Sequence, residues 1–292
     1  MPGARPTISK PLLTVSQDNN PPSVNFDLLT TNTTFFDASW AEYMANRTGP
    51  LTVTGGHNRL IASLQNLTTD HAQLISTLIT ALDSSAYLPA HYRNKPTLLA
   101  GYATQVAIAT NHLTAGVQPL IEFGWGGRAG LGTVLQKPLS RGTVLINSTN
   151  PHPALSPPLV DFNTLTHPFD ARAAVLTFKM MRRFFASPSL AALQPEEVAP
   201  GAAVQTDEQI ETALRGSMMS PHNAHPCGTA GMLPRRLGGV VDGELRVYGV
   251  RRLRVVDASV LPVIPAANLQ ATMYAVAEKA ADVIKGERYG EE

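Results

Sequence analysis

The chain has 292 residues, a formal net charge of +1 and 43% hydrophobic residues. A chain of this length forms one large unit or two smaller ones, and its apolar content suffices for a packed core. The balanced charge gives no reason to expect nucleic acid or an anionic membrane as a partner. The single cysteine, Cys227, excludes an internal disulfide, and no apolar run approaches the roughly 20 residues of a membrane-spanning helix.

The first half of the chain is predicted to contain helices and then strands. Residues 1–25 lack periodicity and are expected to form a tail or loop. Apolar residues at helical spacing predict one or two helices over 57–82, interrupted near 68–70, and a further helix over 96–113. Strands are expected next, separated by glycine-containing and proline-containing breaks, at 117–125, 132–136 and 141–147.

The middle of the chain returns to helices after a proline-rich connector. The prolines of residues 147–159 exclude a helix and predict an extended segment. Apolar residues along one side predict a helix over about 169–185. A short helix is expected after that, with Asp207 as its N-terminal cap.

The last part of the chain combines strand-like segments with one long helix. Past residue 237 the pattern predicts a hairpin with Gly243 near its turn, and then a short buried strand over 253–257. An amphipathic helix is predicted over about 269–285. Because strands and helices are grouped rather than alternating one for one, we expect an α+β fold, with an antiparallel sheet and helices packed on it.

A glycine-rich stretch, 124–132, carries Gly124, Gly126 and Ala129 at the spacing of a dinucleotide-binding fingerprint. Such a fingerprint needs a helix directly after it, because the N–H groups at the start of that helix bind the pyrophosphate. Strand-like residues and Pro138 follow here instead. We interpret the stretch as a loop between strands.

The segment 221–232, PHNAHPCGTAGM, holds two histidines three positions apart in a backbone rich in proline and glycine. Histidine titrates near neutral pH, as a proton-transfer group should. His222, His225 and Cys227 are also zinc-ligand types, but a fourth ligand is not evident, so a metal site is not expected. Taken alone, either histidine is more often structural than catalytic.

Three stretches together resemble the glucose-methanol-choline (GMC) oxidoreductases, in particular the aryl-alcohol oxidases and choline dehydrogenases. The most specific is 221–286, which contains HPCGTAGM and LRVVDASVLPVIPAANLQATMYAVAEKAADVIKG. QKPLSRGTVLINSTNPHP at 136–153 is similar to the start of the family's C-terminal region, and WAEYMANRTGPLT at 40–52 to its middle part. The resemblance implies a tail (1–25), a substrate-covering segment (26–135) and a C-terminal region (136–292).

The family's functional residues can be matched to positions of this chain. His225, directly before Pro226, corresponds to the catalytic histidine, and Asn268 to the second member of the active pair. His222 corresponds to no assigned role. The implied FAD-contacting residues are Asp257, Ala258, Asn268, Leu269, Gln270 and Thr272.

The resemblance implies oxidation of the CH–OH group of an alcohol, with hydride transfer to FAD and His225 as general base. The family's N-terminal G-x-G-x-x-G half is not part of this sequence, so the final strand and helix belong to an incomplete FAD-binding domain with an exposed apolar surface. Three explanations for the absent half remain open. The sequence is a partial gene, it is one piece of a split enzyme with a separate FAD-binding chain, or it is a relative reused without redox chemistry. The alternatives to alcohol oxidation are therefore an FAD-independent lyase, isomerase or cyclase that uses His225, and an inactive fragment.

Sequons at four asparagines hint at secreted relatives: Asn32, Asn46, Asn66 and Asn147.

Overall fold

The computed structural model describes residues 7–8, 13–15, 28–52, 58–125, 132–149, 152, 156–193, 195–197, 199–222 and 224–289. Helices and small antiparallel sheets make up these residues, which confirms the expected α+β class. Within these ranges, no helix is both long enough and apolar enough to cross a membrane.

Helices account for most of the regular structure. The α-helices are α1 (Leu28–Thr31), α2 (Thr33–Asn46), α3 (Leu64–Leu67), α4 (His71–Ile75), α5 (Pro96–Ala115), α6 (Pro168–Phe185), α7 (Asp207–Ala213) and α8 (Leu269–Tyr289). Single π-helical turns follow α4 (Ser76–Thr80) and α7 (Leu214–Met218). Short 3₁₀ turns lie at Pro50–Thr52, Ser84–Tyr87, Ala90–Tyr92, Pro188–Leu193, Arg235–Leu237 and Ala258–Val260.

The strands form one larger sheet and two small pairs, all antiparallel. The larger sheet has the order β3–β4–β5–β1–β9, with β3 at Asn58–Ala62, β4 at Ile121–Trp125, β5 at Gly132–Leu135, β1 at Thr7–Ile8 and β9 at Met219–Ser220. One pair joins β6 (Thr143–Leu145) to β7 (Leu159–Asp161), and the other joins β2 (Leu13–Val15) to β8 (Pro195–Glu197).

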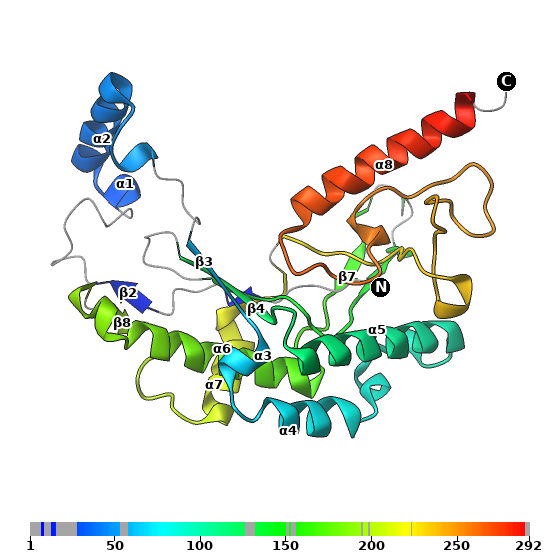
Figure 1. Ribbon diagram of the computed structural model, residues 1–292, viewed down its shortest axis with the longest axis horizontal. Helices are drawn as coiled ribbons and strands as arrows, with labels where there is room; N and C mark the ends of the chain where they lie inside the picture. Colours follow the sequence, from blue (N-terminus) through cyan, green and yellow to red (C-terminus); the bar gives the residue numbers. More distant parts are fainter. Residues whose placement is uncertain are drawn as a thin grey trace.

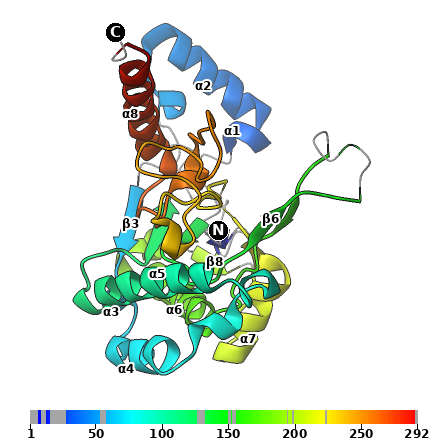
Figure 2. The same cartoon turned by 90° about the vertical axis from the view of Figure 1, so that its right-hand side faces the viewer.

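The elements are arranged around a layer of helices. Figure 1 shows α4, α5 and α6 along one side of the molecule, with the strands β3 and β4 against them. Helices α2 and α8 project away from this layer, and Figure 2 shows both on the side opposite α4. In Figure 1 these two helices stand well apart from each other.

The main apolar core lies between the larger sheet and α6. Phe178 and Met181 of α6 are buried, and the ring of Phe123 in β4 meets Phe184 edge-on at 5.2 Å. Burying side chains of this size stabilises the fold by about 1.5–3 kcal/mol each. Because α6 brings buried residues from several of its turns, it is the helix that organises the core.

Several predicted elements are confirmed by the structure. The predicted helices at 96–113 and 169–185 correspond to α5 and α6, and the predicted final helix to α8. The interruption near 68–70 separates α3 from α4. Each of the three predicted strands around the glycine-rich stretch contains one observed strand, β4, β5 and β6. Residues 126–131, most of that stretch, lie outside the described residues, as does much of the proline-rich connector.

Two predictions in the first three quarters of the chain were wrong. Residues 58–62 form strand β3 instead of the start of a helix, because Leu60 pairs with Phe123 of β4 across the sheet. The cap of α7 is Thr206, one residue before the predicted Asp207. Thr206 accepts from the N–H of Gln209, whose side chain reaches back to complete a capping box, so Asp207 becomes the first helical residue.

The hairpin predicted around Gly243 is reduced to one antiparallel bridge, between Val241 and Val247, and the buried strand predicted at 253–257 was wrong. Asp242 Oδ1 accepts from the N–H groups of Glu244 and Arg246, both at 2.9 Å, and the N–H of Asp242 donates to the carbonyl of Arg246 across the turn at 3.0 Å. Residues 253–257 contribute one isolated bridge, between Arg246 and Arg254. The N–H of Val247 donates to the carbonyl of Leu253 at 3.0 Å and that of Val255 to the carbonyl of Leu245 at 3.2 Å, so the pairing is one bridge long, and Leu253 and Val256 are exposed instead of buried.

The carboxylate of Asp170, in the first turn of α6, is fully buried and bonded to backbone. It accepts from the N–H of Leu139 at 2.8 Å and from that of Ser140 at 2.7 Å. Ser140 Oγ in turn accepts from the N–H of His167 at 3.1 Å. Hydrogen bonds to an ionised group are among the stronger ones in proteins, so this carboxylate fixes residues 137–141 to the start of α6.

His167, fully buried before the first turn of α6, has two ring nitrogens with different roles. Nδ1 accepts from the N–H of Phe169 at 3.2 Å, so Nε2 carries the ring proton and donates it to Ser84 Oγ at 3.0 Å. Burial lowers the pKa of His167; Asp170 opposes this shift and Arg141 adds to it. A Ser84–His167 hydrolytic pair is excluded, because the nitrogen facing the hydroxyl is a donor and not a base.

We expect acid to destabilise the protein through His167. The unfolded imidazole takes up a proton near pH 6.5, whereas the folded one, with its lowered pKa, stays neutral. The contribution is complete above pH 6.5 and is lost as the pH falls below it, by up to about 1.4 kcal/mol per pH unit. Urea unfolding between pH 7 and 5 should therefore give a shallower pH slope for His167→Asn than for the parent. Equal slopes in the two proteins would contradict this assignment.

The buried tyrosines Tyr92 and Tyr102 form a matched pair for a second prediction. Burial raises the pKa of both, that of Tyr92 to about 12. The Tyr102 hydroxyl donates to the carbonyl of Leu139 at 3.0 Å, whereas the Tyr92 hydroxyl has no partner within the described part of the chain. Tyr102→Phe should lower the free energy of unfolding by about 1 kcal/mol, and Tyr92→Phe should leave it unchanged or raise it. Urea denaturation at pH 7 measures both, and a larger loss in Tyr92→Phe would refute the prediction.

Candidate active site

Two segments singled out from the sequence meet in one small apolar cluster. They are residues 221–232, called the histidine loop from here on, and the start of α8. Cys227, Leu261, Ile264 and Leu269 are buried together, and Met273 of α8 packs against them. Cys227 lies two residues after His225, and Leu269 directly follows Asn268. The cluster therefore packs the chain neighbours of these two candidate residues against each other.

Backbone hydrogen bonds align the histidine loop with the segment before α8. The N–H of Gly228 donates to the carbonyl of Ala258 at 3.1 Å, and two more such bonds follow in step along both segments. They run from Ala230 to Ser259 (2.9 Å) and from Met232 to Val260 (2.8 Å). The loop thus lies along residues 258–260 in a fixed register.

His225 and Asn268 are both half-buried, so each side chain is partly accessible to a ligand. Asn268 stands immediately before α8, whose first turn contains no acidic residue. The second histidine of the loop, His222, is held locally: its Nδ1 accepts from the N–H of Ala224 at 3.0 Å, and its ring lies 4.8 Å from that of Phe162.

The other residues matched to cofactor contacts lie around the same segment. Asp257 is exposed, and its carboxylate accepts from the N–H of Ser259 at 2.8 Å, which caps the 3₁₀ turn Ala258–Val260. Leu269 is buried in the apolar cluster. The half-buried members are Ala258 and Thr272, while Gln270 is exposed. Within the described ranges, no group of three His, Cys, Asp or Glu side chains is arranged to hold a metal ion.

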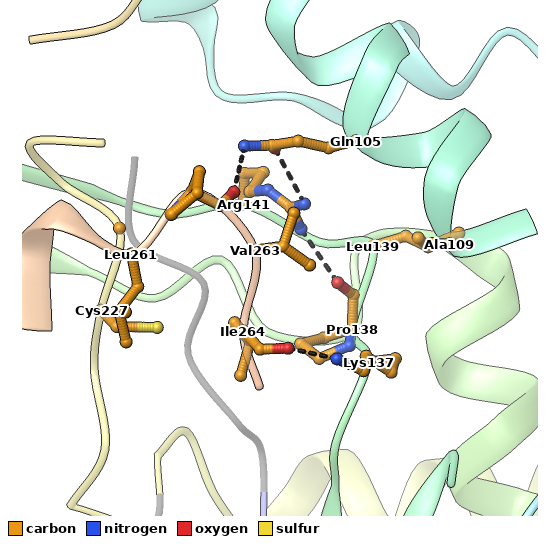
Figure 3. A pocket seen from close by; sticks show the side chains of 12 residues that line it. Gln105, Ala109, Lys137, Pro138, Leu139, Arg141, Cys227, Leu261, Val263 and Ile264 are labelled. Carbon is orange, nitrogen blue, oxygen red and sulfur yellow. Dashed lines mark hydrogen bonds between the residues drawn. The ribbon is translucent and has the colours of Figure 1, made fainter. Parts of the chain in front are cut away.

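Two polar side chains, those of Gln105 and Lys137, bond to this C-terminal part, and Arg141 supports Gln105 (Figure 3). Gln105 of α5 donates from Nε2 to the carbonyl of Pro262 at 2.7 Å, and its Oε1 accepts from Arg141 Nη2 at 3.1 Å. Lys137 donates from Nζ to the carbonyl of Ile264. Gln105 and Lys137 are buried, so these bonds are shielded from competing water.

Sequence reasoning missed this bridge. Gln105 had a detectable signal, since it is a lone amide in a stretch of small and apolar helical residues. Lys137 and Arg141 had none, because basic residues in a loop are usually solvated.

Two cavities share Gln105 and Gly228 in their walls. The smaller, about 30 Å³, is also lined by Lys137, Arg141 and Cys227 (Figure 3). The larger, about 230 Å³, has a mostly apolar lining that includes Tyr92, Leu98, Val144, Leu145, Leu233 and Val240. His225 and Asn268 line neither of these two cavities.

Comparison with known proteins identifies the class. Residues 138–277 match the GMC oxidoreductase family in its C-terminal domain. The chain is 44% identical over 192 residues to dehydrogenase xptC of Emericella nidulans, covering 66% of this chain. It is 34% identical over 276 residues to a dehydrogenase of Armillaria gallica, covering 90% of this chain. Residues 138–277 therefore correspond to the C-terminal domain of the GMC oxidoreductases, as the sequence resemblance implied.

Solved structures agree with this assignment. An FAD-dependent oxidoreductase from Chaetomium thermophilum is 36% identical and superposes with a TM-score of 0.88 over 98% of this chain. A fungal aryl-alcohol oxidase is 32% identical, with a TM-score of 0.83 over 98% of this chain. This chain spans 48% of each of those two structures, and 30% and 41% of the Emericella and Armillaria dehydrogenases.

We expect Gln105→Leu to loosen the C-terminal part from the helical layer. The substitution removes the bonds to Pro262 and Arg141 and leaves a part-buried carbonyl without its partner, at a cost of about 1 kcal/mol. The sole cysteine, Cys227, is buried beside this bridge and should react faster with a thiol reagent in the variant.

Gln65→Leu is the matched control for this prediction. It also removes a hydrogen bond from a glutamine Nε2 to a carbonyl, that of Leu113, at 2.8 Å. The lost bond joins α3 to the end of α5 and does not reach the C-terminal part. Its Cys227 labelling rate should equal that of the parent. Equal acceleration in both variants would mean that Gln105 has no special role in holding the C-terminal part.

Proposed function

We propose that the chain is the substrate-handling, C-terminal half of an FAD-dependent GMC oxidoreductase that oxidises the CH–OH group of a small alcohol. The observation that supports this most directly is the shared apolar cluster of Cys227 and Leu269, which brings the histidine loop to the start of α8. The similarity to an aryl-alcohol oxidase favours alcohol as the substrate class. In this proposal residues 26–135 cover the substrate and residues 136–292 carry the site.

The residues present fit the flavin end of FAD. The first N–H groups of a helix have no partner within it, and they carry roughly half a positive charge. Helix α8 has no acidic residue in its first turn to offset that charge. This donor set suits the flavin ring, whose reduced form is anionic along its pyrimidine edge. The residues that would hold it are Asp257, Ala258, Asn268, Leu269, Gln270 and Thr272.

The chemistry assigned to this chain is proton removal and orientation of the alcohol. A neutral His225 imidazole accepts the hydroxyl proton as the carbon–hydrogen bond breaks, and such help is worth about 10²–10⁴-fold in rate. The amide of Asn268 hydrogen-bonds the substrate oxygen and fixes its orientation. FAD, when bound, supplies the acceptor for the hydride.

The chain matches 48% of each of the two solved relatives described above. We propose that a separate FAD-binding chain supplies the adenine side of the cofactor pocket. The half-buried positions of His225 and Asn268, away from the walls of the two cavities, support a site that is completed by a partner.

His225→Ala should abolish alcohol oxidation, lowering kcat by about 10²–10⁴-fold, when the chain is assayed with an FAD-binding half. His222→Ala is the matched control, because that histidine is engaged locally with Ala224 and Phe162. It should lower kcat only slightly. Circular dichroism spectra confirm that both variants fold. Equal losses from the two substitutions would contradict the assignment of the base.

Flavin content separates this proposal from the non-redox alternative. We expect bound-flavin absorbance in the purified assembly and loss of turnover when flavin is removed. If a colourless preparation still turns over a substrate, and His225→Ala still stops it, the activity is that of a lyase, isomerase or cyclase.

A further inference from the structure

The cavity of about 230 Å³ lies between three segments that are distant from one another in the sequence. Its walls come from residues 91–105 around the start of α5, from residues 142–145 with strand β6, and from residues 228–240, which include the end of the histidine loop. An apolar cavity of about 150 Å³ is large enough to hold benzene, so this one has room for a substituted ring. Because neither His225 nor Asn268 lines it, the cavity is distinct from the site proposed above.

The lining of this cavity is chiefly apolar. Five aliphatic side chains belong to it: Leu98, Val144, Leu145, Leu233 and Val240. The described residues that line it include no Asp, Glu, Lys or Arg, and the one imidazole among them belongs to an exposed residue, His91. A charged ligand would lose its hydration there without gaining a counter-charge, so the lining favours a neutral molecule.

Two polar side chains in the wall are buried, those of Tyr92 and Gln105, and they differ in their partners. Both ends of the Gln105 amide already bond to protein, at the carbonyl of Pro262 and at Arg141 (Figure 3). The Tyr92 hydroxyl has no hydrogen-bond partner among the described residues, although Tyr92 is only 1% exposed. Because a buried hydroxyl is costly unless something bonds to it, we expect this atom to bond to a ligand.

The Tyr92 hydroxyl can donate a hydrogen bond throughout the neutral pH range. Burial raises the pKa of Tyr92 to about 12, and the positive charge of Arg141 opposes this rise without cancelling it. The proton therefore stays on the oxygen at neutral pH. A matching ligand atom is an acceptor, such as a carbonyl oxygen.

We infer that this cavity binds a small neutral molecule with an apolar body the size of one ring and one oxygen acceptor, which accepts a hydrogen bond from the Tyr92 hydroxyl. Gly228 and Thr229 also belong to the wall, three and four residues after His225, so a bound ligand would contact the histidine loop as well. Binding at this second site needs neither flavin nor turnover and is therefore independent of the proposed function.

Ligand-observed NMR titrations of the full chain with three benzene derivatives test this site. Acetophenone carries a carbonyl acceptor, ethylbenzene lacks one, and benzoate carries a charge. Tyr92→Phe removes the hydroxyl and keeps the ring, and Tyr102→Phe is the matched control, because the Tyr102 hydroxyl bonds to Leu139 and lies outside the lining. Val144→Trp fills the cavity from an exposed position in β6, where a strand accepts an aromatic side chain. His225→Ala reports any binding at the proposed alcohol site.

We expect the parent to bind acetophenone about 3–10-fold more tightly than ethylbenzene, the ratio that one hydrogen bond provides, and to bind benzoate more weakly than either. Tyr92→Phe should remove the preference for acetophenone, and Val144→Trp should abolish binding of both neutral ligands. Tyr102→Phe and His225→Ala should change neither affinity. The inference is overturned if acetophenone shows no saturable binding, if its preference survives in Tyr92→Phe, or if benzoate binds most tightly. A loss in His225→Ala equal to that in Tyr92→Phe also overturns it, because the ligand would then occupy the proposed alcohol site.

Discussion

Two backbone N–H groups, those of Leu139 and Ser140, point at the buried carboxylate of Asp170, and the rest of the structure depends on this contact. A buried carboxylate without such donors would cost several kcal/mol, so it fixes the segment after β5 firmly to α6. The same segment carries Lys137, which bonds to the carbonyl of Ile264, and Arg141, which bonds to Gln105. Its position thus decides whether Lys137 reaches the C-terminal part.

The C-terminal part depends on that reach because its own apolar clusters are small. One cluster contains four buried residues around Cys227, and the other packs Val276 and Ala280 of α8 against neighbouring loops. The main core around α6 is far larger. Polar bonds from Gln105 and Lys137 to the carbonyls of Pro262 and Ile264 therefore orient a segment that has limited apolar packing of its own. Positioning of the histidine loop follows from this orientation.

Local periodicity predicted the elements that pack on the protein's own core, and missed those that depend on distant partners. Helices α5, α6 and α8 follow from apolar spacing alone. Strand β3 was misread as helix because its pairing with β4, about sixty residues away, leaves no local trace. The strand predicted at 253–257 is reduced to one bridge, between Arg246 and Arg254, because Leu253 and Val256 are exposed and a short apolar run does not show whether it will be buried. For the site, motif resemblance supplied His225 and Asn268, while Gln105, Lys137 and Arg141 emerged only from the packing.

The division of apolar surface sets the main core apart from the two projecting helices. The core between the larger sheet and α6 is closed within this chain, so it needs no partner to bury its phenylalanines. By contrast, Phe36, Trp40 and Met44 of α2 and Tyr274 and Ile284 of α8 are exposed, and these two helices stand apart in Figure 1. Because Ser39 is the only buried residue of α2, apolar burial is concentrated in the helical layer, and the stability of the fold depends on that layer.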